Sequence, residues 1–366
     1  MALAVAGALV VVGAGASAIF WVSGSGPHEP TAAESPHRSA SAFTVVSTTP
    51  DGGSKPVAPA TPITVSFSAP VAKDSTMPSL SPPVSGTWSL MSPSELEFVP
   101  SAPLVPGANE SVVIPGGSSG MTSTQGVHLV DSASVAFSVE TGSVLRLQQL
   151  LAELGYLPLS FTPTSPITSV VQEADIQPGT FSWRWPDQPS SLTSLWATGQ
   201  MNVITRGAVM DFESQHGLKT DGIAGPAVWT ALLTDALSAH TSANHYHYVY
   251  VSEADPEMVT VYQDGSQVYR TLANTGVPAA PTDQGTFPVF ARYVSTTMTG
   301  TNPDGSKYDD PGVPWVSYFN GGDALHGFIR GGYGYPQSDG CVEMAPGDAA
   351  VVYPLTPIGT LVTVGN

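Results

Sequence analysis

The sequence is poor in cysteine and in charged side chains. Its 366 residues contain a single cysteine, Cys341, which excludes an intrachain disulfide and any zinc site built on several thiolates. Only 11% of the residues are charged, with 11 Lys and Arg against 29 Asp and Glu and a net charge of −18. Such a negative field repels phosphate backbones and anionic lipids, so nucleic acid is not an expected partner. The lone thiol is either a buried structural side chain or a reactive group.

Proline and glycine, by contrast, are abundant, with 34 and 37 residues respectively. Together with the low charge, they predict short strands, many turns and a polar surface made of Ser and Thr rather than Lys and Glu. A chain of 366 residues exceeds one ordinary core and fits two or three domains of roughly 100 residues each. The sequence therefore predicts a multidomain, mainly β protein.

An apolar run lies near the N-terminus. Residues 2–22 carry no charged side chain, and as a helix rising about 1.5 Å per residue they would span about 30 Å, the thickness of a bilayer core. Residues 1–24 are therefore predicted to be a membrane anchor or a signal peptide. The small residues at 16–18 resemble a cleavage site, but apolar residues 19–22 extend the run past it, which favours a retained anchor. Residues 25–42, rich in Ser, Pro, Gly and Ala, predict a flexible linker.

Residues 43–141 alternate short β-branched runs with turn clusters. This spacing predicts a β-sandwich. The predicted strands include residues 63–67, 86–88, 96–99, 111–114 and 135–139. The pattern also resembles the immunoglobulin-like domains of bacterial cell-surface proteins, and it carries no catalytic motif.

Residues 142–237 predict a small helical domain. Val144, Leu147 and Leu151 fall on one face of a first helix, and Pro226 begins a last one. The order LQ, LGY, AV, F, GL, DG, GP and W along this segment resembles the three-helix peptidoglycan-binding-like domain. The resemblance implies that glycan is a partner.

An insertion over residues 158–200 interrupts the helical domain. It carries three tryptophans, Trp183, Trp185 and Trp196. Their indole rings would either cover a glycan-binding groove or extend the core, and the sequence leaves both interpretations open.

Residues 243–366 return to strand patterns. Residues 248–251 and 259–262 are rich in Val and Tyr, and Asp264-Gly265 is a hairpin signal. A β-rich C-terminal domain is therefore predicted.

The single thiol lies near the end of this domain, fifteen positions after His326. A thiol attacks an amide as the thiolate, and a neighbouring imidazole can take its proton, so Cys341 and His326 are the minimum set for acyl transfer. Gly340 permits a tight turn whose backbone N–H groups could stabilise an oxyanion. On spacing alone, a buried structural cysteine remains the commoner case.

The residues around Cys341 resemble the catalytic domain of YkuD-type L,D-transpeptidases. That family has a His followed by Gly or Ser, a similar gap, and then Ser-His-Gly-Cys, where this chain has Ser-Asp-Gly-Cys at 338–341. Further matches lie upstream at Thr275-Gly276, Pro281-Thr282 and Gly285-Thr286-Phe287. The resemblance implies that Cys341 takes the acyl group from a tetrapeptide stem, that His326 is the base, and that the Gly327 carbonyl orients the imidazole.

Two residues depart from the family's pattern. Asp339 stands where a second His is usual, and Glu343 stands where Arg or Asn is usual. If His326 is the base, Asp339 leaves the dyad intact. A carboxylate at 343 would weaken a contact with a stem-peptide carboxylate, so Arg330 is the candidate to supply that positive charge. Ser338 and Asp339 are expected to support the turn, by bracing it or by contacting substrate.

Several aromatic and histidine side chains are further candidates. Tyr308, Trp315 and Tyr318 are candidate substrate-binding residues, and the first two flank a Gly- and Pro-rich segment predicted to be a loop over the substrate. The same aromatic residues would otherwise belong to the core. His245 and His247 alternate on one strand, but no carboxylates accompany them at ligand spacing, so no metal site is predicted there.

These expectations combine into one functional hypothesis, an anchored or secreted extracytoplasmic L,D-transpeptidase of the cell wall. It would form 3-3 cross-links between donor and acceptor stem peptides through a cysteine thioester, with no metal or organic cofactor. Two alternatives remain open. The same dyad in an L,D-carboxypeptidase would give the acyl group to water, and a non-catalytic wall-binding protein would use Cys341 only structurally. The oligomeric state is not predicted.

Overall fold

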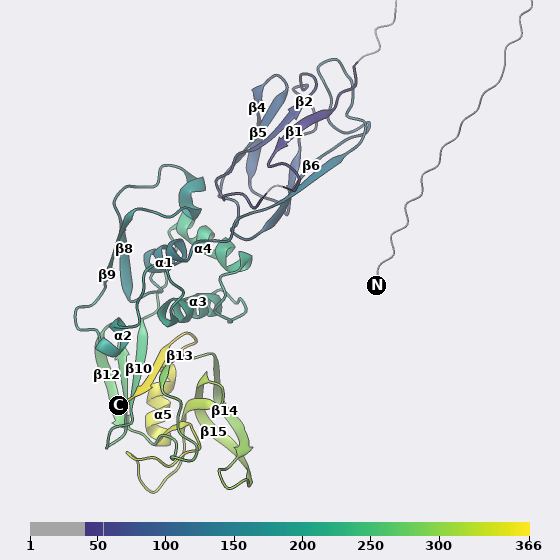
Figure 1. Cartoon of the computed structure of the whole chain (residues 1–366). Coiled ribbons are helices and arrows are strands. Elements are labelled where there is room, and N and C mark those ends of the chain that lie inside the picture. The colour runs from purple at the N-terminus through teal and green to yellow at the C-terminus, as the bar shows by residue number, and fades with distance from the viewer. Residues whose placement is uncertain (1–40, 54) are drawn as a thin grey trace, which may run out of the picture. The chain divides into compact units, whose positions relative to one another are not determined.

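The computed structural model describes residues 41–53 and 55–366 (Figure 1). The predicted anchor and nearly all of the predicted linker lie outside these residues. No helix within the described part of the chain is long and apolar enough to cross a membrane. The described chain is multidomain and mainly β, as predicted.

The N-terminal domain is a sandwich of two antiparallel sheets. Along the central strand, Ile63, Val65 and Phe67 are buried while Thr64 and Ser66 are half-buried, which is the alternation of a strand with one face in a core. One sheet has the order β1 (Val45–Thr49), β2 (Ile63–Phe67), β5 (Glu95–Pro100), β4 (Gly86–Ser92). The other has the order β3 (Ser79–Ser81), β6 (Asn109–Ile114), β7 (Ala133–Ser138).

Three helices form the core of the second domain, α1 (Val144–Glu153), α3 (Val203–Gln215) and α4 (Pro226–Ser238) (Figure 1). The side chain of Ser143 caps the first turn of α1, and Pro226 occupies the first turn of α4, where its missing N–H costs nothing. Buried side chains such as Leu150, Phe212 and Trp229 join the helices. The prediction of a helical domain is confirmed.

The insertion folds against this helical core. It contains the hairpin β8 (Leu159–Pro163) and β9 (Gly179–Trp183), the 3-10 helix η1 (Val170–Ala174) and the short α2 (Ser190–Thr193). Trp183 and Trp196 are half-buried and pack against the hydrophobic core, which supports the core interpretation for these two rings. Trp185 lies under the guanidinium of Arg184, 4.5 Å from ring to Cζ.

The C-terminal domain contains two sheets, whose strands are antiparallel except for the pairs β10–β18 and β16–β17. At the predicted hairpin, Asp264 and Gly265 both have positive φ, as a tight two-residue turn requires. The first sheet has the order β12 (Ser266–Leu272), β11 (Met258–Gln263), β10 (His247–Ser252), β18 (Leu361–Gly365), β13 (Gly285–Pro288). The second has the order β14 (Ala291–Thr301), β15 (Lys307–Asn320), β16 (Asp323–Gly327), β17 (Val342–Met344), followed by α5 (Pro346–Val352) and η2 (Tyr353–Leu355).

One structural feature differs from the sequence prediction. The Gly- and Pro-rich segment between Tyr308 and Trp315 was expected to be a loop, but it belongs to strand β15 of a long hairpin. In this part β15 pairs with β14 alone, whereas its pairing with β16 begins at Ser317. Pro311 and Pro314, which lack an N–H, are tolerated because they lie in an edge segment.

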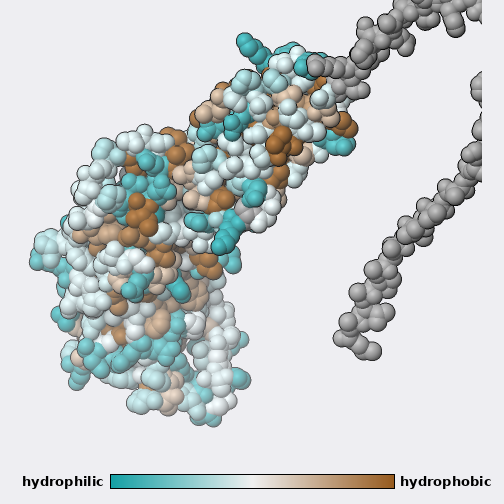
Figure 2. Space-filling view, turned by 45° about the horizontal axis from the view of Figure 1, so that its top comes forward, coloured by the Kyte–Doolittle hydropathy of each residue, from teal (hydrophilic) through white to brown (hydrophobic). Residues whose placement is uncertain are grey.

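The surface agrees with the composition. In the face seen in Figure 2, most residues are pale or weakly hydrophilic, and hydrophobic residues form scattered patches. This is the surface expected of a chain rich in Ser, Thr and Gly with only 11% charged residues.

Candidate active site

Cys341 and His326 line one cavity of about 290 Å³ in the C-terminal domain. His326 lies on β16, and Cys341 immediately precedes β17. These strands pair in parallel, with Leu325 opposite Val342, and both of these apolar side chains are buried in the core. Core packing therefore fixes the two strands that carry the thiol and the imidazole.

A glycine turn holds the thiol in place. Gly340 has φ +114°, and a Cβ at this position would lie 2.8 Å from Oδ1 of Asp323, so only glycine fits. The Ser338 hydroxyl donates to the Cys341 carbonyl oxygen and accepts a hydrogen bond from the Gly340 N–H at 3.2 Å. The Cys341 thiol donates to the carbonyl oxygen of Gly322, with Sγ and O 3.6 Å apart. Ser338 thus braces the turn from inside.

The upstream Thr-Gly motif supports this turn from the other side. Val277 N donates to Ser338 O at 2.9 Å, and Ser338 N donates to Thr275 O at 3.1 Å. The buried carboxylate of Glu257 accepts hydrogen bonds from both the backbone N–H and the hydroxyl of Thr275. Gly276 is needed here because a Cβ would lie 2.2 Å from the carbonyl oxygen of Ala280.

The imidazole of His326 is buried, with 2% of its surface exposed. Its Nδ1 lies 3.1 Å from the Gly327 carbonyl oxygen, which can only accept, so Nδ1 carries the hydrogen and Nε2 keeps a lone pair. Burial lowers the pKa of His326 from its ordinary value of 6.5. The imidazole is therefore neutral near pH 7 and able to accept a proton.

The thiol is protonated in the resting protein. Burial, together with the nearby carboxylates of Asp323, Glu343 and Asp339, raises the pKa of Cys341 to about 12. A thiol of this kind becomes a nucleophile only when a base removes its proton.

Comparison with known families gives three matches along the chain. Residues 246–364 match the L,D-transpeptidase catalytic domain (YkuD), residues 39–139 match a bacterial Ig-like domain, and residues 193–232 match a peptidoglycan binding domain. The C-terminal domain is an L,D-transpeptidase catalytic domain. The catalytic-domain and peptidoglycan-binding matches together support peptidoglycan as the substrate and action outside the cytoplasm.

Several solved structures of L,D-transpeptidases are similar to this chain. L,D-transpeptidase 3 from Mycobacterium tuberculosis is 14% identical, with 88% of this chain and 99% of that chain covered and a TM-score of 0.31. An L,D-transpeptidase from Mycobacterium smegmatis is 15% identical, with 88% and 98% covered and a TM-score of 0.30. The catalytic domain of the Enterococcus faecium L,D-transpeptidase is 26% identical, with 34% and 99% covered and a TM-score of 0.30. No curated protein sequence matches this chain significantly.

The two departures from the family motif, Asp339 and Glu343, both line the cavity of the L,D-transpeptidase domain. Glu343 forms a two-point ion pair with Arg330, whose Nε and Nη2 each lie 2.7 Å from one carboxylate oxygen. The Arg330 guanidinium also lies 4.7 Å from the centre of the Phe328 ring. Arg330 brings a cation to the cavity wall, and Glu343 holds it there.

This ion pair gives a test of stability. The side chain of Glu343 is 6% exposed and that of Arg330 is 31% exposed. We expect Arg330→Met to lower the free energy of unfolding by about 3 kcal/mol, because it leaves a buried carboxylate unpaired. The double variant Arg330→Met/Glu343→Gln should lose clearly less of the free energy of unfolding, since no buried charge remains. Urea unfolding measures both, with Arg270→Met on an exposed part of β12 as the matched control. Equal losses in the single and double variants would contradict this account.

The aromatic candidates separate into two groups. Tyr308 lines the cavity, and Tyr318 packs in a small apolar cluster that also contains Cys341. Burial raises the pKa of both tyrosines. Trp315 lies elsewhere, because its ring packs against the core of the domain and lies 5.6 Å from the ring of Tyr353.

Part of the cavity wall was not predicted from the sequence. Asp310, Met298, Asn302 and Val313 come from the β14–β15 hairpin and line the cavity. The spacing of Tyr308 and Asp310 could have shown that they share one face of a strand. That signal was hidden because the segment was expected to be a loop.

The histidines at the start of the domain are bonded to other side chains. His245 Nδ1 pairs with the Asp264 carboxylate, and His247 Nε2 lies 3.3 Å from the Gln263 side-chain oxygen. They line a different and smaller hollow from the one that contains Cys341.

Proposed function

We propose that the catalytic domain is a peptidoglycan L,D-transpeptidase that forms 3-3 cross-links through a thioester on Cys341, with His326 as the base. One observation carries the proposal. The only thiol of the chain and a buried neutral imidazole with a free Nε2 lone pair line the same cavity. Arg330, Tyr308, Ser338 and Asp339 line the same cavity, where the donor stem peptide would lie.

The first half-reaction acylates the thiol. His326 Nε2 takes the proton from Sγ as Sγ attacks the carbonyl carbon of the L,D-amide in the donor stem. The backbone N–H of Cys341 is the candidate donor to the oxyanion, since the Gly340 N–H already donates to the Ser338 hydroxyl. The C–N bond then breaks, and the imidazolium returns its proton to the leaving amine of the terminal D-residue. A thioester on Cys341 remains.

The second half-reaction transfers the acyl group. The side-chain amine of an acceptor stem loses its extra proton to solvent and attacks the thioester as the free amine. His326 takes the proton that the nitrogen loses on forming the amide and gives it to the Cys341 sulfur as that sulfur leaves. Two features favour an amine over water. The carboxylates of Asp310 and Asp339 line the cavity and attract a cationic amine. A second hollow of about 460 Å³ shares Asp310, Val313 and Phe328 with the first and gives room for a second peptide.

The products distinguish the alternatives. The full chain incubated with a tetrapeptide-stem muropeptide is expected to give a cross-linked dimer, with one D-residue released per link, in liquid chromatography with mass detection. Asp310→Asn should shift the products several-fold from the dimer towards the hydrolysed tripeptide, because it removes the charge that attracts the amine. Asp309→Asn is the matched control, since Asp309 is exposed and is its immediate neighbour.

Each other outcome has a defined meaning. Tripeptide alone would identify an L,D-carboxypeptidase that uses the same dyad. Neither product would favour a non-catalytic wall-binding protein. An unchanged dimer-to-tripeptide ratio in Asp310→Asn would contradict the part assigned to its carboxylate.

A further inference from the structure

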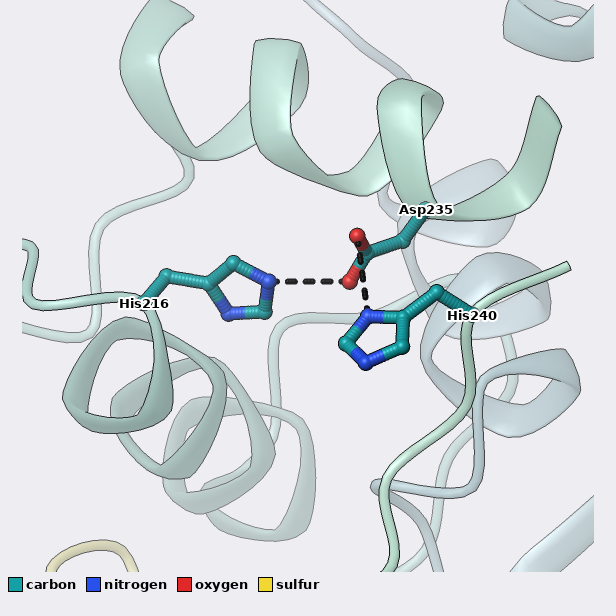
Figure 3. Close-up of side chains that lie close together, drawn as sticks. All are labelled: His216, Asp235 and His240. Carbon is teal, nitrogen blue, oxygen red and sulfur yellow. Dashed lines mark hydrogen bonds and ion pairs between the residues drawn. The ribbon is translucent and has the colours of Figure 1, made fainter. Parts of the chain in front are cut away.

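Two imidazoles and one carboxylate meet at the C-terminal ends of α3 and α4. His216 is the C-cap residue of α3, Asp235 lies in the last turn of α4, and His240 follows that helix. Figure 3 shows both rings directed at the Asp235 carboxylate. His216 Nε2 lies 2.9 Å from Asp235 Oδ2, and His240 Nδ1 lies 3.2 Å from Asp235 Oδ1. Three atoms of the kinds that bind metal ions thus lie within 4.8 Å of one another.

The contacts of His216 leave a lone pair at the centre of this group. Its Nδ1 lies 2.9 Å from the Phe212 carbonyl oxygen, which can only accept, so Nδ1 carries a hydrogen. The Phe212 ring stacks on the imidazole with the centroids 3.9 Å apart, which holds the ring in this orientation. In the neutral ring, the Nε2 lone pair therefore faces a carboxylate oxygen. Either a proton or a metal ion must lie between them.

The electrostatics of the position favour a cation. Asp235 is buried, with 7% of its surface exposed. The C-terminal end of a helix carries partial negative charge, and here two such ends converge on the same carboxylate. The Nδ1–H bond of His216 to a backbone carbonyl is also the outer contact that histidine ligands of metals usually make.

We propose that His216, Asp235 and His240 bind a divalent transition-metal ion, for which Zn²⁺ is the best fit. Imidazole nitrogens with one carboxylate suit zinc rather than Mg²⁺ or Ca²⁺. Neighbouring ligands of tetrahedral zinc lie roughly 3.3 Å apart, close to the observed 2.9 and 3.2 Å. The His240 side chain is 66% exposed, so its ring is free to turn and supply the third protein ligand, and water can take the fourth position.

The ion would tie together three parts of the chain. It would link the end of α3 to the end of α4 and to the segment that leads into the catalytic domain. That segment is bonded to the helical domain again at Ser242, whose N–H donates to the Leu154 carbonyl oxygen at 2.8 Å. The ion would bind His216 Nε2 directly, and its role would be structural. The site is separate from the cavity that contains Cys341.

Calorimetric titration with Zn²⁺ tests the site directly. The full chain carries Cys341→Ala, so that the catalytic thiol cannot bind metal, and is first treated with a chelator. One Zn²⁺ per chain is expected. His240→Ala, which removes a mostly exposed side chain, should weaken binding at least about 100-fold, because a direct ligand is lost. His128→Ala, an exposed histidine of the N-terminal sandwich, is the matched control and should bind unchanged.

Two further measurements distinguish coordination by these three side chains from nonspecific metal binding at the surface. Co²⁺ should give the visible absorption of a tetrahedral site, and His216→Gln and His240→Ala should each abolish it. Zn²⁺ should raise the Tm of the parent chain but not that of His240→Ala. Absence of Zn²⁺ binding, or equal affinity in the parent and in His240→Ala, would overturn the proposal. If His216→Gln fails to fold, the comparison of His240→Ala with His128→Ala remains decisive.

Discussion

Incubated with a carbapenem, the full chain is expected to gain the mass of one inhibitor molecule, and Cys341→Ala is expected to gain none. The lactam carbonyl of the inhibitor is an acyl donor, and the thiolate formed when His326 takes the Cys341 proton would open the ring and keep the acyl group as a thioester. Because Cys341 is the only cysteine, no other thiol can replace it. Intact-protein mass spectrometry over a time course measures the effect, which is a complete loss rather than a partial one.

Controls make this result specific. Cys341→Ser keeps the shape of the site but has a far weaker nucleophile, so it too should remain unmodified over the time course. An adduct that persists in Cys341→Ala would place acylation on another residue and reject the proposed nucleophile. No adduct on the parent chain would favour the wall-binding alternative. Asp339, which replaces the motif's usual His, would then be the first residue to test as the cause of the lost reactivity. Asp339→His would then show whether the motif's usual residue restores acylation.

The parts of the fold that were predictable depend on short-range signals. The turn at Asp264 and Gly265 needs positive φ at both positions, and few residue pairs allow this. Pro226 begins α4 because proline is tolerated only in the first turn of a helix. The turn at Gly340 was equally visible, since glycine next to a reactive residue indicates close backbone approach. In each case the information lies within a few neighbouring residues.

The features that the sequence did not predict depend on contacts between residues distant in the chain. Apart from Tyr308, the cavity wall on β14 and β15 was missed because Pro311 and Gly312 are signals of a loop, and only pairing with β14 makes this segment a strand. The pairing of Arg330 with Glu343 arises from the fold around β16 and β17, and no local pattern predicts it. His216 and Asp235, nineteen positions apart, meet only because α3 and α4 end at the same place.

His326→Gln is expected to slow carbapenem acylation by about 10²- to 10⁴-fold without abolishing it, because glutamine keeps the shape but cannot act as a base. The pH dependence should change with it. The active form needs neutral imidazole, and burial lowers the pKa of His326 below its ordinary value of 6.5, so the midpoint of the fall in the parent rate on acidification should lie below pH 6.5. In His326→Gln the rate should instead rise about tenfold per pH unit through the alkaline range, because the pKa of Cys341 is about 12 and thiolate must form without help.

Acylation rates from time-resolved intact mass between pH 5 and 9 test both parts. His245→Gln is the matched control, since that imidazole pairs with Asp264 and lies outside the cavity that contains Cys341. A parent profile that rises steadily with pH would mean that the thiol ionises without His326 in the rate-determining step. An unchanged rate in His326→Gln would point the same way. The assignment of His326 as the base would then be wrong, and Cys341 would be a nucleophile activated by another group.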